Sequence, residues 1–143
     1  MQIFVPYVQP YKTARCLDNR RLAKQIIEVI QILSANTKVD VGWKIPKYIY
    51  NHPTTKLYYD YKGLLYLVDY LFFILYEYKK RKNKEHKCQR LFKYFDKWHV
   101  LFISLDENWI PEHLTEEFCT KHQQLLLKKD FNYYNKFFNK NPI

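Results

Sequence analysis

Apolar residues recur every three or four positions over residues 57–75, which is the spacing of a buried helical face. They are Leu57, Tyr61, Leu64, Leu65, Val68, Leu71, Phe72 and Leu75. This pattern predicts a long helix from about Thr55 to Lys80 that is apolar on most sides and lies at the centre of a helical bundle. The chain has only 2 glycines among 143 residues, which argues against a turn-rich β architecture and against phosphate-binding glycine loops.

The rest of the chain is also predicted to be helical. A first helix is expected from Thr13, as its N-cap, to about Ser34. Residues 3–8, with prolines at 6 and 10, are expected to form an extended arm, and the prolines of residues 39–53 exclude a long helix there. Shorter patterns predict a turn over 79–87, a helix over 89–104, a break at 106–108, a helix over 111–129 with Pro111 in its first turn, and a tail over 131–143. Residues 1–143 are therefore predicted to form one all-α domain, a compact helical bundle.

The charge of the chain predicts an anionic partner. Lys and Arg number 24 against 14 acids, so the formal net charge is +10, and double-stranded DNA is the partner we expect, with acidic membranes as the competitor. The apolar segment 57–78 is interrupted by Asp60, Lys62 and Asp69, so we expect no membrane-spanning helix. Three widely spaced cysteines and the absence of a signal-like leader predict an intracellular protein with reduced thiols. We expect it to be a monomer.

A polar stripe runs along the segment LDNRRLAKQIIEVIQIL, residues 17–33. At about 3.6 residues per turn, Arg21, Lys24, Glu28 and Gln31 share one helical face. The opposite face carries Leu22, Ile26, Val29, Ile30 and Leu33. A single carboxylate among cations is expected to stay ionised, and a groove lined in this way attracts polyanions. The alternative is a solvated helix face on which the Lys24–Glu28 pair contributes a few tenths of a kcal/mol.

Two further segments are candidates for DNA contact. His52 lies in the turn Asn51-His52-Pro53, just ahead of a predicted helix N-terminus, where phosphates bind readily; the alternative is a capping turn. Residues 125–138 interleave cations with aromatic rings, the pattern of a groove that follows a nucleic-acid backbone. The candidates there are Lys128, Lys129, Tyr133 and Tyr134. Their alternative role is to close the core with aromatic side chains.

Metal binding is not predicted. Cys119 and His122 are three residues apart and His86 and Cys88 are two apart, so a four-ligand zinc site is formally possible. Neither pair has the tight spacing of paired cysteines, and packing in the core explains buried cysteines. We expect neither a metal nor an organic cofactor.

Four sequence blocks together resemble one protein family. They are FVPY at 4–7, LDNRRLAKQIIEVIQIL at 17–33, GW and NHP at 42–43 and 51–53, and HQQLLLKKDFNYYNKFF at 122–138. In order and spacing they resemble the pyrimidine-dimer DNA glycosylases of the endonuclease V type, with residues 79–120 the least similar part. The resemblance implies an all-helical domain that binds UV-damaged DNA and attacks C1′ of the damaged nucleotide with an amine. The base is displaced, an imine forms, and β-elimination cuts the strand.

The resemblance also assigns roles to particular residues. The essential carboxylate on the first long helix matches Glu28, because a basic residue followed by Leu stands seven positions earlier, as Arg21-Leu22 does here. Arg21 is then a DNA contact, and we expect Arg20 and Gln31 to contact DNA from the same helix. His52 and the following residues 58–60 match a similar histidine and aromatic segment.

Two departures from the family pattern bear on the mechanism. Family enzymes expose the amine of a small second residue after Met1 is removed, but Gln2 is large, so we expect Met1 to be retained. We favour the Met1 α-amine as the nucleophile, because α-amines in general have a pKa of about 7.7 to 8.0; Lys24 is the alternative, and loss of the lyase step is a third. Ile27 and Gln31 stand where the family has arginines, so DNA contacts must come from elsewhere.

Two other functions stay open at this stage. The chain could be a non-catalytic basic DNA-binding or packaging protein on the same fold, or a glycosylase for a hypermodified base. Trapping of an imine on abasic DNA separates the first of these from the enzyme.

Overall fold

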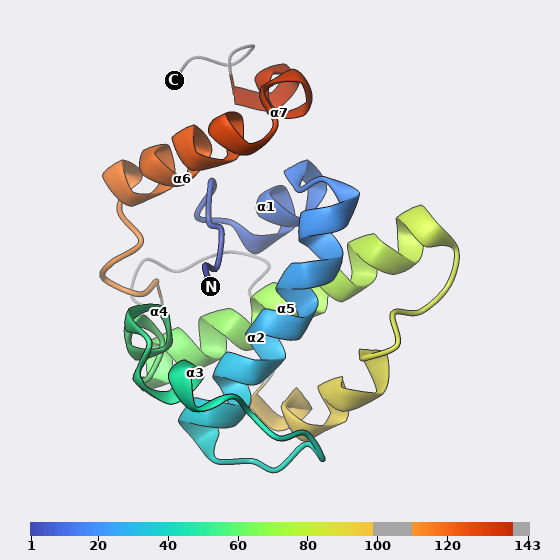
Figure 1. Cartoon of the computed structure of the whole chain (residues 1–143), viewed down its shortest axis with the longest axis vertical. Coiled ribbons are helices and arrows are strands. Elements are labelled where there is room, and N and C mark those ends of the chain that lie inside the picture. Colours follow the sequence, from blue (N-terminus) through green and yellow to red (C-terminus); the bar gives the residue numbers. More distant parts are fainter. Residues whose placement is uncertain (99–109, 139–143) are drawn as a thin grey trace.

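The apolar segment forms α5 (Tyr61–Lys82), the helix against which α1 (Pro10–Cys16) and α2 (Asn19–Thr37) pack in the computed structural model (Figure 1). The structure describes residues 1–98 and 110–138. Within these ranges the chain is helical and contains no strand, so the predicted all-α fold is confirmed. No helix in the described ranges has the length and apolar character needed to cross a membrane.

The first predicted helix is in fact two helices. Leu17 has an extended backbone, with ψ of 135°, and separates α1 from α2. Helix α1 begins at Pro10, which suits the first helical turn, and the hydroxyl of Thr13 donates to the carbonyl of Tyr7 at 3.0 Å. The prediction of one helix that begins at Thr13 was therefore wrong.

Arg81 of α5 stabilises the break between α1 and α2. Its guanidinium donates to the carbonyl oxygens of Ala14, Arg15 and Leu17, which end α1 without helical partners. Its Nε also lies 2.9 Å from Oε1 of Glu77, so the cation is paired on its own helix. Arg81 belongs to the basic run 79–87, for which we predicted a turn. Residues 79–82 instead continue α5, which ends at Asn83 in the left-handed conformation (φ 54°).

The connector before α5 holds two short helices, α3 (Lys47–Asn51) and α4 (Pro53–Leu57). Helix α5 begins at Tyr61 and not at Thr55, because the carboxylate of Asp60 caps it and accepts from the amide of Gly63 at 2.8 Å. A Cβ at residue 63 would lie 2.6 Å from Cα of Tyr58, so the chain passes too close for any residue but glycine.

The C-terminal part differs from the prediction in three places. Residues 89–94 and 96–98 form the 3-10 helices η1 (Gln89–Tyr94) and η2 (Asp96–Trp98), and the rest of the predicted helix, with the break at 106–108, lies outside the described residues. Helix α6 (Glu116–Lys129) begins five residues after Pro111, because Thr115 caps it. The segment predicted as a tail forms α7 (Phe131–Phe138) up to the last described residue.

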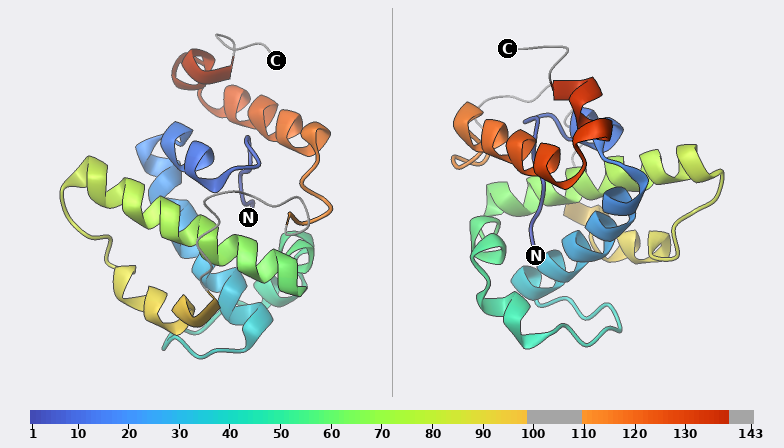
Figure 2. Two further views of the ribbon diagram at one scale, coloured as in Figure 1. Left: turned by 180° about the vertical axis from the view of Figure 1, so that it is seen from behind. Right: turned by 45° about the horizontal axis from the view of Figure 1, so that its top comes forward.

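The N-terminal arm has no regular secondary structure over residues 1–9 and is buried over Ile3, Phe4 and Val5. Both further views place α6 and α7 at one end of the molecule, beside this arm, and the connector after α2 at the opposite end (Figure 2). The arm therefore lies in the interior, with its first residues directed along α2. The three cysteines are buried and free.

Candidate active site

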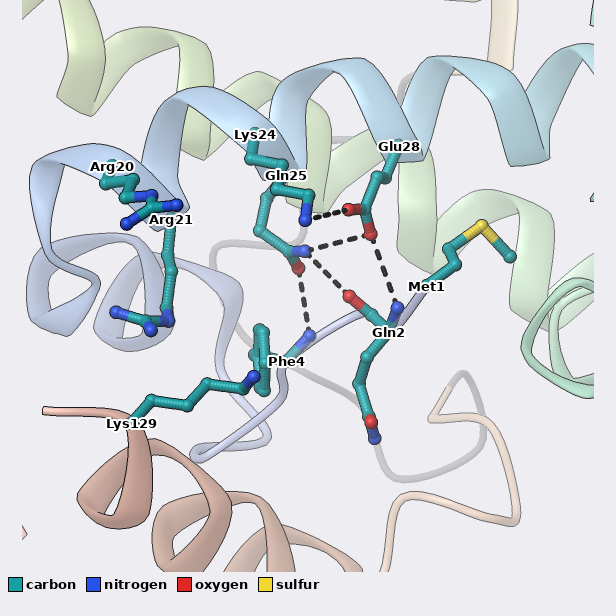
Figure 3. A pocket seen from close by; sticks show the side chains of 9 residues that line it. All are labelled: Met1, Gln2, Phe4, Arg20, Arg21, Lys24, Gln25, Glu28 and Lys129. Carbon is teal, nitrogen blue, oxygen red and sulfur yellow. Dashed lines mark hydrogen bonds and ion pairs between the residues drawn. The ribbon is translucent and has the colours of Figure 1, made fainter.

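A cavity of about 340 Å³ lies where the arm, α2 and the end of α6 meet (Figure 3). It is lined by Met1, Gln2 and Phe4 of the arm, Arg20, Arg21, Lys24, Gln25 and Glu28 of α2, and Lys129 of α6. The cavity thus brings together six of the predicted site residues, from three separate parts of the chain. The other five candidates, Gln31, His52, Lys128, Tyr133 and Tyr134, do not line it.

Glu28 is buried at the inner side of this cavity, with 8% of the residue exposed. Its Oε1 lies 3.8 Å from Nζ of Lys24, and its Oε2 accepts from the backbone amide of Gln2 at 3.3 Å and from Nε2 of Gln25 at 3.4 Å. Burial raises the pKa of Glu28 above its ordinary value, while the Gln2 bond, Lys24 and the terminal amine lower it by less.

The cations do favour the ionised form of Glu28, as the charge pattern predicts, but they are not the largest influence on its pKa. Desolvation outweighs the attraction of the cations. Arg21 adds nothing to the pairing of Glu28, because its guanidinium pairs with the carboxylate of Asp18 at 3.2 Å. A carboxyl group whose pKa is raised by burial exchanges its proton at a pH closer to neutral than an exposed carboxyl group does.

Gln25 fixes the arm against α2 and α5. Its Nε2 donates to the carbonyl of Gln2 at 2.7 Å, and its Oε1 accepts from the amide of Phe4 at 2.9 Å and from the hydroxyl of Tyr70 at 3.0 Å. The residue is 2% exposed, so these bonds form away from water. Gln25 was not among the predicted site residues, although a polar residue on the buried face, three residues after Leu22, was a signal that could have identified it.

His122 of α6 holds the other side of the arm. Its Nδ1 accepts from the amide of Val5 at 2.8 Å, so the neutral ring carries its proton on Nε2. That nitrogen lies 3.1 Å from the side-chain amide of Gln2, which must then present its oxygen. Burial, and next the nearby His113, lower the pKa of His122 to about 4, which keeps the ring neutral. The side chain of Gln123 adds a bond to the carbonyl of Pro6 at 2.9 Å.

These contacts bring the N-terminus of the chain to Glu28. Because the amide of Gln2 is bonded to the carboxylate, the Met1 α-amine is only one residue away, and its charge is among the causes that lower the pKa of Glu28. The Met1 side chain packs with Trp43 against a small apolar cluster of Ala35, Ile45 and Ile49. In Figure 3 the Met1 side chain points away from Lys129, which lies with Arg20 and Arg21 on the other side of the cavity, whereas Lys24 lies beside Glu28.

The sequence pattern of the pyrimidine dimer DNA glycosylases matches residues 1–90. The chain belongs to this family. The match includes Met1, Lys24 and Glu28, and it supports glycosylase activity on DNA in general. It ends before residues 122–138, the last block of the resemblance. No curated protein and no solved structure matches the chain.

The remaining predicted DNA contacts do not line this cavity. His52 caps α4 through its Nδ1, which accepts from the amide of Thr54 at 3.1 Å, and it is near enough to Glu28 to lower the pKa of that carboxyl group slightly. Lys128 is exposed on α6. Gln31 lines a different cleft, together with Trp43 of the connector.

Tyr133 and Tyr134 pack α7 against the junction of α1 and α2. Tyr134 is fully buried, its hydroxyl is bonded to the carboxylate of Asp18, and its ring stacks on Phe138 at 5.7 Å. The hydroxyl of Tyr133 donates to the carbonyl of Leu17 at 3.3 Å. Burial of Tyr134 argues against base stacking by this ring and favours the alternative that we gave for it, closure of the core.

The two histidines named for a zinc site form hydrogen bonds to backbone amides instead. His86 accepts from the amide of Cys88 at 3.0 Å through Nδ1, and His122 binds the arm. Within residues 1–98 and 110–138, no three His, Cys, Asp or Glu side chains are grouped so that they could hold a metal ion.

Proposed function

We propose that this chain is a DNA N-glycosylase with AP-lyase activity that excises pyrimidine dimers, uses the Met1 α-amine as nucleophile, and uses Glu28 as the carboxylate that assists it. The observation that carries the proposal is the hydrogen bond from the amide of Gln2 to Oε2 of Glu28. It joins the free end of the chain to a buried carboxyl group inside a cavity lined with cations. A role of Glu28 limited to an exposed ion pair would not explain why the arm converges on it.

In the first step the amine nitrogen of Met1 attacks C1′ of the damaged nucleotide. The new N–C1′ bond forms as the bond from C1′ to the base breaks, and its electron pair leaves with the base, which takes up a proton. Positive charge develops on the sugar at this stage, and a carboxylate beside it stabilises that charge. Glu28 can also accept the proton that the attacking amine loses, since its raised pKa brings its titration toward neutral pH.

In the second step the bond from C1′ to the ring oxygen breaks, the ring oxygen takes up the proton that Glu28 holds, and an imine remains between Met1 and C1′. A base removes the proton from C2′, the C3′–O bond breaks, and the strand is cut as the 3′ phosphate leaves. Glu28 is a carboxylate already in the cavity that can take this proton. Arg20, Arg21 and Lys129 line the same cavity and supply positive charge for the flanking phosphates.

The geometry favours Met1 over Lys24 as the nucleophile. The Lys24 side chain is 72% exposed and its amine is paired with Oε1 of Glu28, so attack would require it to leave that pair. The arm, in contrast, is held at Gln2, Phe4, Val5 and Pro6 by buried or partly buried hydrogen bonds. Such a fixed approach of the reacting group is a main source of rate enhancement in enzymes.

Reduction with borohydride on abasic duplex DNA tests the proposal directly. We expect a covalent complex, and peptide mass mapping should place the sugar on Met1. The variant Lys24→Gln should still be trapped, whereas attachment at Lys24 in the wild-type protein would refute the assignment of Met1. DNA binding without trapping would favour the non-catalytic DNA-binding protein. Excision of another modified base, but not of pyrimidine dimers, would refute the substrate that we propose.

A further inference from the structure

A second cleft, of about 420 Å³, lies along α2 beyond the active-site cavity. It is lined by Ile27 and Gln31 of α2, Trp43 and Lys44 of the connector, and Lys87, Cys88 and Arg90 at the start of η1. We call it the Trp43 cleft. The connector and the segment before η2 both lie toward the lower end of the molecule in Figure 1, at the end of α2 that is remote from α6.

The Trp43 cleft has the composition of a site for a nucleotide. Lys44, Lys87 and Arg90 are exposed, no carboxylate lines the cleft, and none of the three cations pairs with an acid of the described residues. Trp43 is half-buried and packs on the Ala35, Ile45 and Ile49 cluster, which holds the indole in place. Cations that bind phosphate beside a fixed aromatic ring that stacks on a base are the usual means of holding single-stranded nucleic acid.

The Trp43 cleft lies within reach of a strand bound at Glu28. Lys24 and Glu28 line the active-site cavity and Gln31 lines the cleft, so three to seven residues of α-helix separate them, about 5 to 10 Å at about 1.5 Å per residue. A DNA strand rises about 3.4 Å per nucleotide, so about one to three nucleotides cover this distance. Met1 and Trp43 also contact the same apolar cluster, so the two sites share one rigid support.

We infer that the Trp43 cleft is an accessory DNA-binding site for the strand that leaves the active site, about one to three nucleotides from the reacting one. Lys44, Lys87 and Arg90 contact phosphates there, and Trp43 stacks on a base that has left the stack of the duplex. The assignment rests on the proposed function for its ligand class, DNA, and adds a site outside the reacting centre. Its effect is on binding and on the length of DNA that is recognised, not on imine formation.

The salt dependence of binding tests the cations of the cleft. The variant Lys44→Gln/Lys87→Gln/Arg90→Gln is compared with Lys12→Gln/Lys62→Gln/Lys80→Gln, which loses the same charge from α1 and α5. The probe is a duplex that carries a tetrahydrofuran abasic analogue. Each phosphate contact contributes about 0.9 to the slope of log affinity against log salt, so the cleft variant should lose about 2 to 3 from that slope and the control should lose none. Equal slopes for the cleft variant and the wild type would refute the assignment of the Trp43 cleft as a DNA-binding site.

The length of the DNA tests the position of the cleft. The affinity of the wild type and of each variant is measured for duplexes that extend two or six nucleotides from the abasic analogue, on the 5′ or on the 3′ side. The wild type should gain affinity from the longer extension on one side only, and the cleft variant and Trp43→Ala should lose that gain. Trp43→Phe keeps an aromatic ring on the apolar cluster and should retain most of it. Trp43→Leu keeps the apolar contact without an aromatic face and should lose the gain, which separates stacking from a folding defect.

The results distinguish this inference from the proposed function. Imine trapping at Met1 with no effect of the cleft on length or salt dependence would leave the glycosylase proposal intact and refute the accessory site. A one-sided gain that depends on the cleft, without trapping, would support the accessory site on a non-catalytic DNA-binding protein. A wild-type protein that does not bind the probe would refute both.

Discussion

The backbone amide of Gln2 donates to Oε2 of Glu28 at 3.3 Å, so the start of the chain and the candidate catalytic carboxyl group are one hydrogen bond apart. Residue 2 and residue 28 meet because the arm runs back along α2, and Gln25 and His122 hold it from two sides. Glu28 consequently has two tasks, with Oε2 facing the arm and Oε1 facing Lys24. A substitution at residue 28 that keeps the shape of the side chain can therefore distinguish the catalytic role of Glu28 from its role in holding the arm.

We expect Glu28→Gln to reduce turnover by at least two orders of magnitude while folding and DNA binding stay nearly unchanged. The amide oxygen of Gln can still accept from the amide of Gln2, whereas it can neither take a proton nor stabilise positive charge as a carboxylate does. The lost ion pair with the exposed Lys24 contributes about 0 to 1 kcal/mol at most. Single-turnover cleavage of UV-irradiated and abasic duplexes measures the rate, and circular dichroism checks the fold. Cleavage at the wild-type rate would remove Glu28 from the mechanism.

Gln25 is predicted to position the nucleophile without touching DNA. Gln25→Leu should release the arm, lower the rate of imine formation about tenfold or more, and leave the affinity for DNA within about twofold, because a small misplacement of a reacting group is costly. Exchange of the Phe4 amide hydrogen should accelerate, since its bond to Oε1 of Gln25 is lost. Gln124→Leu on α6 is the matched control, because Gln124 is exposed and lines neither the active-site cavity nor the Trp43 cleft. If both variants formed the imine equally fast, the positioning role would be wrong.

The long helices and the Glu28 site were predictable because their signals are local. The three- and four-residue spacing of apolar side chains identified most of α2 and α5, and the polar stripe pointed to Lys24 and Glu28. The resemblance added Met1, which no periodicity indicates. These residues line one cavity in the structure.

The features that the sequence did not predict depend on contacts between distant residues. The break at Leu17 is stabilised by Arg81, 64 positions later, and no neighbour of Leu17 announces it. His122 was considered only as a metal ligand, because its bond to the Val5 amide joins residues 117 positions apart. Helix α7 forms where Tyr134 is buried against Asp18, so its aromatic side chains order a segment that resembled a tail.

Arg81 is predicted to be a structural residue and not a DNA contact. Arg81→Met should lower the free energy of unfolding by about 2 kcal/mol or more, because three main-chain carbonyls lose a charged donor. Lys80→Met removes the same charge from an exposed neighbour and should change stability by less than about 0.5 kcal/mol. Urea denaturation of both variants measures the difference. Equal stability of the two variants would show that the carbonyls find water or other donors.

The last prediction concerns acid and the arm. The pKa of His122 is about 4 in the folded chain and about 6.5 when unfolded, so between these values the unfolded state binds more protons. The stability that the neutral ring provides is thus complete above about pH 6.5 and is lost as the pH falls toward 4, by up to about 3 kcal/mol.

Glu28 acts in the opposite direction, because its raised pKa adds stability at low pH that is lost as the pH rises through its folded pKa. The net slope for the wild type is therefore smaller than that of His122 alone. His122→Gln can still accept from the Val5 amide through its side-chain oxygen but does not titrate. Urea denaturation at intervals from pH 4 to 7 should show stability rising with pH more steeply in the wild type than in His122→Gln. Parallel curves would mean that His122 does not carry the acid sensitivity of the arm.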